Sequence, residues 1–137
     1  MDGVRADPEP ALRILLVERD PIDAAVLVQV MRASRGTPNV ATAASFAAAV
    51  EVLAREAIDT IFCSVAPQKL EVFRALVRTA RPRPVVALVT EGESETRKQA
   101  IQAGAVCAVC KERLLSSFAQ RLVRGTRACA DRMPANS

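Results

Sequence analysis

The chain has 137 residues, 50% of them hydrophobic, and a net charge of +4. This length supports one domain with a buried core, and the small positive charge permits weak anion binding without requiring it. Histidine, tryptophan and tyrosine are absent. Their absence excludes Ser-His and Cys-His nucleophile pairs, histidine metal ligands and most aromatic platforms for single-stranded nucleic acid.

The first part of the chain predicts a buried strand followed by a capped helix. Residues 12–17 read LRILLV, a continuous apolar run typical of a strand buried on both faces. Asp20 is placed to cap the next helix, which is expected to run to about Ser34. Residues 39–43 predict a short second strand, after which Ser45 is expected to cap a second helix.

The rest of the chain repeats the alternation of strand and helix. The three further strands are expected at residues 60–65, 85–89 and 105–110. A helix is expected after each of them, the last at about residues 113–128. Five strands interleaved with five helices predict a parallel α/β sheet with helices on both faces.

Nothing in the sequence predicts a membrane span or a secretory leader. No apolar run approaches the ~20 residues that a spanning helix needs, and the start, MDGVRADPEP, lacks the features of a signal peptide. We therefore expect a cytoplasmic domain at residues 12–128, with flexible tails at 1–11 and 129–137.

Four stretches together resemble the receiver domain of bacterial response regulators. They are LLVERDPIDAAVL, IFCSVAP, VALVTEGE and GAVCAVCK, each at the carboxyl end of an expected strand. The resemblance implies a flavodoxin-like (βα)5 fold with strand order 2-1-3-4-5 and a site at the carboxyl ends of the strands. It also implies phosphoryl transfer to an aspartate after the third strand, with Mg²⁺ held by that aspartate and two acidic residues after the first strand.

Two of the three carboxylates that the resemblance implies are replaced. Glu18 stands at the first acidic position, whereas Arg19 stands at the second and Ser64 at the acceptor position. An arginine a few Å from the ion would repel it by roughly 4 kcal/mol per unit charge, and a serine hydroxyl needs a nearby base to act as a nucleophile. We therefore expect no metal, no cofactor and no catalysis. Mg²⁺ binding rescued by Asp20 remains an alternative.

The other positions of the pattern are partly kept. Thr90 and Lys111 stand at the positions that contact the phosphoryl group, while Ala108 replaces the aromatic residue that responds to it. Pro67 arrives one residue early, so the loop after the third strand is short.

The basic side chains of this site have two interpretations. In the favoured one, Lys111 pairs with Glu18, and Arg19 points to solvent or to Glu91. In the other, Arg19 and Lys111 bind an anion and reproduce the charge of the phosphorylated state.

The last expected helix carries a candidate partner face. Arg121 and Arg124 share a face opposite the apolar residues Leu115, Phe118 and Leu122. A solvated face is one interpretation, and a partner-binding or homodimer face is the other.

Cys107 and Cys110 form a C-x-x-C pair. On a strand, residues three positions apart point to opposite faces, which suits neither a redox nor a zinc site. We expect both of them, and Cys63, to be small buried side chains with reduced thiols.

These features predict a phosphorylation-independent receiver-like domain of a bacterial two-component-type pathway. It is expected to act by protein–protein contact, with a signalling protein or its own downstream domain as the partner, and not on membranes or nucleic acid. Two alternatives stay open. One is a receiver still phosphorylated with Mg²⁺ on a different carboxylate, and the other is an anion- or nucleic-acid-binding module.

Overall fold

The computed structural model describes residues 11–34 and 36–116. Its strands are β1 (Arg13–Val17), β2 (Asn39–Ala43), β3 (Thr60–Ser64), β4 (Val85–Val89) and β5 (Cys107–Cys110). Its helices are α1 (Pro21–Arg32), α2 (Phe46–Arg55), the short 3₁₀ helix η1 (Pro67–Lys69), α3 (Leu70–Ala80) and α4 (Ser94–Gln102). Residues 111–116 are also helical, so the last predicted helix begins earlier than expected, and its residues 117–128 lie outside the described part of the chain.

The five strands form one parallel sheet in the order β2-β1-β3-β4-β5, which confirms the predicted flavodoxin-like architecture. Val17 pairs with Cys63 at the end of β1 and β3, and Ser64 pairs with Leu88 of β4. The residues that follow β1 therefore lie beside the end of β3. This is the edge at which open α/β sheets place their sites.

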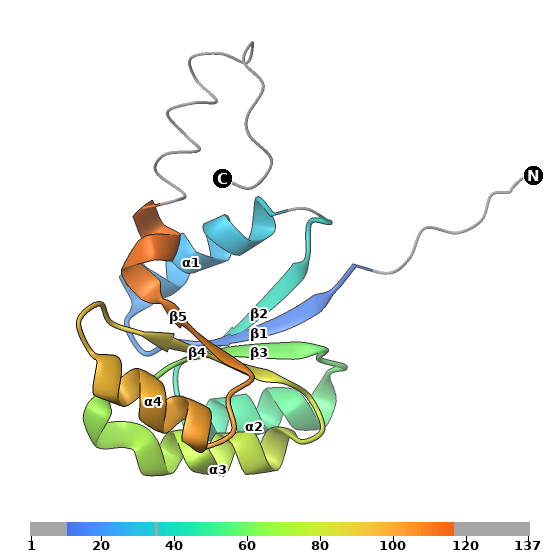
Figure 1. The fold of residues 1–137 in the computed structure, drawn as a ribbon. Helices are drawn as coiled ribbons and strands as arrows, with labels where there is room; N and C mark the ends of the chain where they lie inside the picture. Colours follow the sequence, from blue (N-terminus) through green and yellow to red (C-terminus); the bar gives the residue numbers. More distant parts are fainter. Residues whose placement is uncertain (1–10, 35, 117–137) are drawn as a thin grey trace, which may run out of the picture.

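Helices cover both faces of the sheet (Figure 1). On one face, α1 contributes Leu27 and Met31 to a core with Leu16 of β1. On the other face, α2, α3 and α4 pack around a larger core that includes Phe73 and Ala100. Because β1, β3 and β4 are apolar on both sides, they fit the centre of such a three-layer structure.

Local capping residues fix where two of the helices begin. The Asp20 carboxylate accepts hydrogen bonds from the N–H groups of Ile22 and Asp23, at 2.8 and 3.2 Å, at the start of α1. The Ser45 hydroxyl accepts one from the Ala48 N–H at 3.1 Å at the start of α2. Both caps agree with the prediction and satisfy N–H groups that have no partner inside the helix.

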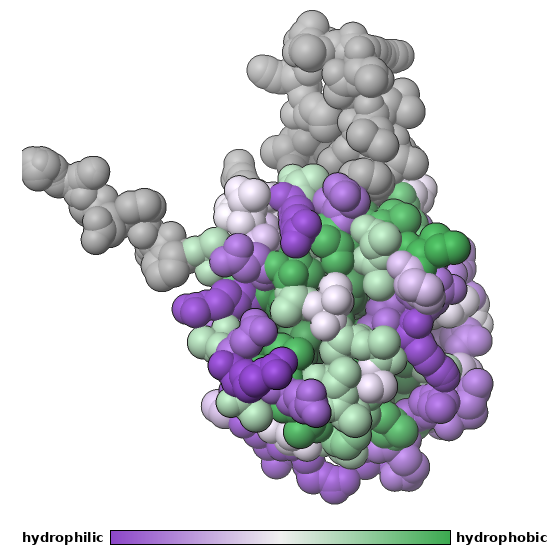
Figure 2. All heavy atoms as spheres, turned by 180° about the vertical axis from the view of Figure 1, so that it is seen from behind, coloured by the Kyte–Doolittle hydropathy of each residue, from purple (hydrophilic) through white to green (hydrophobic). Residues whose placement is uncertain are grey.

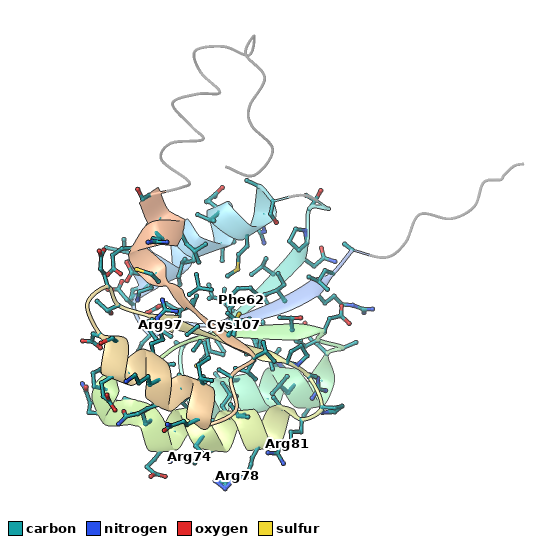
Figure 3. The ribbon with its side chains drawn as sticks, viewed as in Figure 1. Phe62, Arg74, Arg78, Arg81, Arg97 and Cys107 are labelled. Carbon is teal, nitrogen blue, oxygen red and sulfur yellow. The ribbon has the colours of Figure 1, made fainter. Side chains whose placement is uncertain are left out.

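One cysteine prediction is wrong. Cys63 and Cys110 are buried, as expected, but Cys107 is exposed. The physical reason is that β5 is an edge strand, paired only with β4, and the neighbouring Val106 is also 60% exposed. Figure 3 shows Cys107 on β5, the strand in front of the sheet.

The surface mixes apolar and charged side chains. Seen from behind, hydrophobic side chains gather toward the centre of the face and charged side chains lie around them (Figure 2). Within residues 11–34 and 36–116, no helix has the length and apolarity to cross a membrane.

Candidate functional site

Three side chains meet at the carboxyl edge of the sheet. The Ser64 hydroxyl, at the end of β3, donates to the Glu18 carboxylate after β1. The Lys111 ammonium, after β5, donates to the same oxygen, Glu18 Oε1, at 2.9 Å and lies 3.4 Å from Ser64 Oγ. The structure therefore contains the Lys111–Glu18 ion pair that the sequence analysis favoured.

A fourth side chain, Asp23, joins this group and was not predicted to do so. Its Oδ2 atom lies 3.1 Å from Lys111 Nζ. Asp23 is in the first turn of α1, and this turn directly follows Glu18 and Asp20, which is the signal that could have placed it at the site. Lys111 thus stands between two carboxylates.

Glu18 is held from several directions at once. Its other oxygen, Oε2, accepts the Asp20 N–H at 2.9 Å. Burial raises the pKa of Glu18, but the hydrogen bonds from Ser64, Asp20 and Lys111 together outweigh burial and leave the pKa below its ordinary value. Glu18 is only 6% exposed and carries a negative charge at neutral pH.

Lys111 shows the complementary behaviour. Burial lowers its pKa, but the bonds to Glu18 and Asp23 more than compensate and raise the pKa above the ordinary value. Both partners of the pair are therefore charged across the physiological range. With side-chain exposures of 15% for Lys111 and 4% for Glu18, the pair is screened little by solvent.

The other predicted site residues lie nearby but outside this hydrogen-bonded group. Arg19 is exposed, and among the described residues it forms no ion pair with Glu91. Thr90 is exposed at the end of β4. Ala108 packs against the larger core, and its carbonyl accepts a hydrogen bond from Arg97 of α4 at 2.7 Å.

The predicted partner face lies outside the residues that the structure describes. This applies to Arg121 and Arg124, and equally to Phe118 and Leu122 on the same predicted helix. Leu115, the first of the three apolar residues assigned to the opposite face of that helix, is half-buried and packs with the α1 core.

A cavity of about 650 Å³ opens beside the ion pair. Glu18, Ser64 and Lys111 line it on one side, and residues of α2, η1 and α3 line it on the other. Only Val65 and Ala66 separate β3 from η1, in agreement with the short loop noted in the sequence.

A parallel sheet of this order with polar residues at its carboxyl edge defines the class of domain to which the chain belongs. The family model of the response regulator receiver domain matches residues 14–122. The chain therefore belongs to the receiver domain family, and its role is that of a receiver domain in signal transduction.

Solved structures of response regulators share the fold. A Chloroflexus aurantiacus protein assigned to the response regulators is 22% identical with a TM-score of 0.68, over 85% of this chain and 97% of that one. A response regulator from Thermotoga maritima is 20% identical with a TM-score of 0.67, over 84% and 97%. The chemotaxis response regulator CheY4 of Vibrio cholerae is 21% identical with a TM-score of 0.63, over 82% and 99%. No curated protein matches the chain.

Proposed function

We propose that this domain is a receiver that signals without being phosphorylated, through contact with a protein partner. The observation that carries the proposal is the contact of Lys111 Nζ with both Glu18, at 2.9 Å, and Asp23, at 3.1 Å. A fixed ammonium ion supplies the positive charge that carboxylates at this edge would otherwise take from a metal ion. The site is thus charge-balanced from within the chain.

The donor set does not fit Mg²⁺, the ion that the family implies. Mg²⁺ needs oxygen ligands in near-octahedral geometry and is held by carboxylates together with phosphate oxygens. Here Glu18 and Asp23 already share Lys111, while Asp20 uses its carboxylate as the cap of α1. Arg19 adds a positive charge close to the same edge. Asp20 is therefore a poor candidate for a replacement ligand.

The acceptor position also lacks the chemistry of phosphoryl transfer. The Ser64 hydroxyl donates a hydrogen bond to the Glu18 carboxylate and stays neutral. The carboxylate beside it could act as a base only by losing the tight contact with Lys111. Phosphoryl transfer needs positioned charge neutralisation by metal, which this edge does not favour.

Such a domain is expected to act as a non-enzymatic adaptor or regulatory module. Lys111, Glu18, Ser64 and Asp23 tie together the ends of β1, β3 and β5 and the start of α1. This network favours a single conformation of the carboxyl edge. Any switching is expected to come from a bound partner or ligand with different affinities for two states.

The test is an amide NMR titration of the full chain with Mg²⁺ and then with beryllofluoride, which stands in for the phosphoryl group. We expect the amides near Ser64, Thr90 and Lys111 to stay unchanged at millimolar Mg²⁺. Saturable shifts at these amides, or a stable aspartyl phosphate formed from a small phosphodonor, would overturn the proposal.

A matched variant shows that the titration can detect metal binding in this fold. In the double variant Arg19→Asp/Ser64→Asp, three carboxylates surround the edge, as the family pattern implies. We expect this variant to gain Mg²⁺-dependent shifts that the natural chain lacks. If the natural chain and the variant respond alike, the two replacements are not what prevents metal binding.

A further inference from the structure

The cavity beside the Glu18–Lys111 pair has the dimensions of a small-molecule site. Its volume of about 650 Å³ falls within the roughly 300–1,000 Å³ of known ligand pockets. It lies between the ends of β1 and β3, the start of α2, and α3. The connection after β3 leaves this space open because only two small residues, Val65 and Ala66, precede η1.

The far wall of the cavity is apolar and partly open to water. Phe46, the first residue of α2, lines it and is only half-buried, and Val72 of α3 lines it with 44% exposure. Phe73 and Leu76 lie deeper in the same wall. An apolar molecule placed here would remove exposed hydrocarbon surface from water, which favours binding.

The charges around the cavity favour an anion. Glu18 and Lys111 are opposite charges within the lining, and Asp23, which also contacts Lys111, does not line the cavity. The charged side chains that remain in the lining are Arg19, Lys69 and Glu93, which leaves one net positive charge. Glu93, which precedes α4, also accepts a hydrogen bond from the Thr96 hydroxyl at 3.2 Å, so its carboxylate is partly engaged at the start of that helix.

We propose that this cavity binds a small amphipathic monoanion, such as a medium-chain carboxylate. Its hydrocarbon part packs against Phe46 and Val72, and its anionic group lies toward Arg19 and Lys69. The inference rests on the proposed loss of phosphoryl transfer, since a working receiver would hold a metal ion and an acyl phosphate at the adjoining edge. Ligand binding then bridges α2 and α3 beside the position where phosphorylation acts in the family.

The test uses decanoate at submillimolar to millimolar concentration with the full chain, observed by amide NMR. We expect saturable shifts at Phe46, Ala66, Lys69 and Val72. Decylammonium has the same hydrocarbon chain with the opposite charge, and we expect it to bind at least about tenfold more weakly. Equal binding of the two probes, or no saturable binding of decanoate, would overturn the proposal.

Variants of charged side chains distinguish binding in the cavity from non-specific binding of decanoate to the protein surface. Arg19→Gln/Lys69→Gln is expected to weaken decanoate binding about tenfold. The matched control is Arg78→Gln/Arg81→Gln, which removes the same number of positive charges. Arg78 and Arg81 are exposed, lie at the C-terminal end of α3, and do not line the cavity (Figure 3). We expect this control to bind as the natural chain does. Equal loss in both variants means that decanoate follows net charge alone, which contradicts the site.

A second variant blocks the cavity without touching its charges. Ala47 of α2 is exposed and lines the opening, so Ala47→Phe adds a ring there while leaving the core unchanged. An amide spectrum that retains the dispersion of the natural chain shows that this variant folds. Decanoate binding is expected to be lost, and unchanged binding would place the ligand elsewhere and overturn the inference.

The two proposals fail in different ways. Amide shifts caused by decanoate, together with none caused by Mg²⁺ or beryllofluoride, support both proposals. Absence of all shifts overturns only the ligand site, whereas Mg²⁺-dependent shifts near Ser64 overturn the phosphorylation-independent function, whatever decanoate does.

Discussion

Lys111 and Glu18 are 93 positions apart in the chain, yet the Lys111 ammonium lies 2.9 Å from the Glu18 carboxylate at the carboxyl edge of the sheet. The contact joins the end of β5 to the end of β1 across the intervening strands β3 and β4. Both side chains are largely buried. A buried pair of this kind adds little net stability compared with apolar residues, but removing one partner leaves an uncompensated charge.

Single replacements of the pair are therefore expected to be destabilising. Lys111→Met leaves the Glu18 carboxylate buried without its cation and should lower the free energy of unfolding by about 3 kcal/mol. Glu18→Gln leaves Lys111 with Asp23 and should lower it by about 2 kcal/mol. The double variant should lose less than the sum of the two, because neither charge is then stranded. Urea unfolding of the four proteins measures the coupling.

An exposed ion pair in the same molecule serves as the control for this cycle. Arg74 and Glu71 lie 3.2 Å apart on α3, with side-chain exposures of 43% and 88%. We expect Glu71→Gln to change the free energy of unfolding by less than about 0.5 kcal/mol. If Glu18→Gln has an effect as small as that of Glu71→Gln, the buried network does not stabilise the fold.

The same pair predicts how stability depends on pH. The pKa of Glu18 is lowered in the folded state from its ordinary value of 4.5, so its contribution is present above about that pH and is lost as the pH falls through the folded pKa. The pKa of Lys111 is raised from 10.5, so its contribution is present below that pH and is lost as the pH rises through the folded value. The contribution of this pair to the free energy of unfolding, measured with urea, should therefore be constant between about pH 4.5 and pH 10.5 and should fall on either side.

Glu18→Gln separates this effect from the titration of the remaining acidic residues. The variant should be less stable than the natural chain at neutral pH, and the difference should shrink on acidification below about pH 4.5, where Glu18 would be protonated in the unfolded state. A difference that stays constant down to the acid limit would show that the charge of Glu18 does not carry the effect.

The sequence predicted the features that depend on local chemistry. Asp20 and Ser45 cap their helices because a short polar side chain before an apolar helix has few other roles. The Glu18–Lys111 pair was also predictable, since the residues that follow parallel strands meet at one edge and opposite charges there attract. The strand order came from the resemblance to receivers, because the five strand sequences do not encode their neighbours.

Features that depend on packing angles were not predictable. The direction of the Asp23 side chain follows from how α1 packs against the edge, which no pattern in its sequence specifies. The exposure of Cys107 could have been predicted, because the strand order that the resemblance implies already places its strand at the edge of the sheet. The cavity near Phe46 and Val72 results from the space that a short loop leaves unfilled.

The exposure of Cys107 predicts selective thiol chemistry. Burial, followed by the charge of Glu18, raises the pKa of Cys63 to about 12, and a buried thiol of that kind is inert. In a Cys129→Ser background, iodoacetamide should modify Cys107 first in the native protein, and Cys63 and Cys110 only after unfolding. Peptide mass spectrometry identifies the site, and Cys107→Ser, in which native labelling should vanish, is the control. Native labelling of Cys63 would contradict its burial.

Gly104 follows α4 and has a backbone conformation that other residues rarely adopt. Its φ angle is +117°, and a Cβ atom built there would lie 2.7 Å from Val77 Cγ1 of α3. Gly104→Ala therefore combines backbone strain with a clash inside the core, and we expect a loss of about 2–4 kcal/mol in the free energy of unfolding.

Gly92 separates the two contributions. It also has a positive φ angle, +87°, but a Cβ atom there meets nothing within 4 Å. Gly92→Ala should therefore lose only about 1 kcal/mol, from the backbone alone. Urea unfolding of both variants measures the difference in their free energies of unfolding, which is the part due to contact with Val77.

A Val77→Ala background is the control. There the extra loss of Gly104→Ala should largely disappear, because the atom that the new methyl group meets is gone. Equal losses for Gly92→Ala and Gly104→Ala would show that α3 and the residues after α4 move apart to make room for the new methyl group, and that the contact with Val77 has no cost.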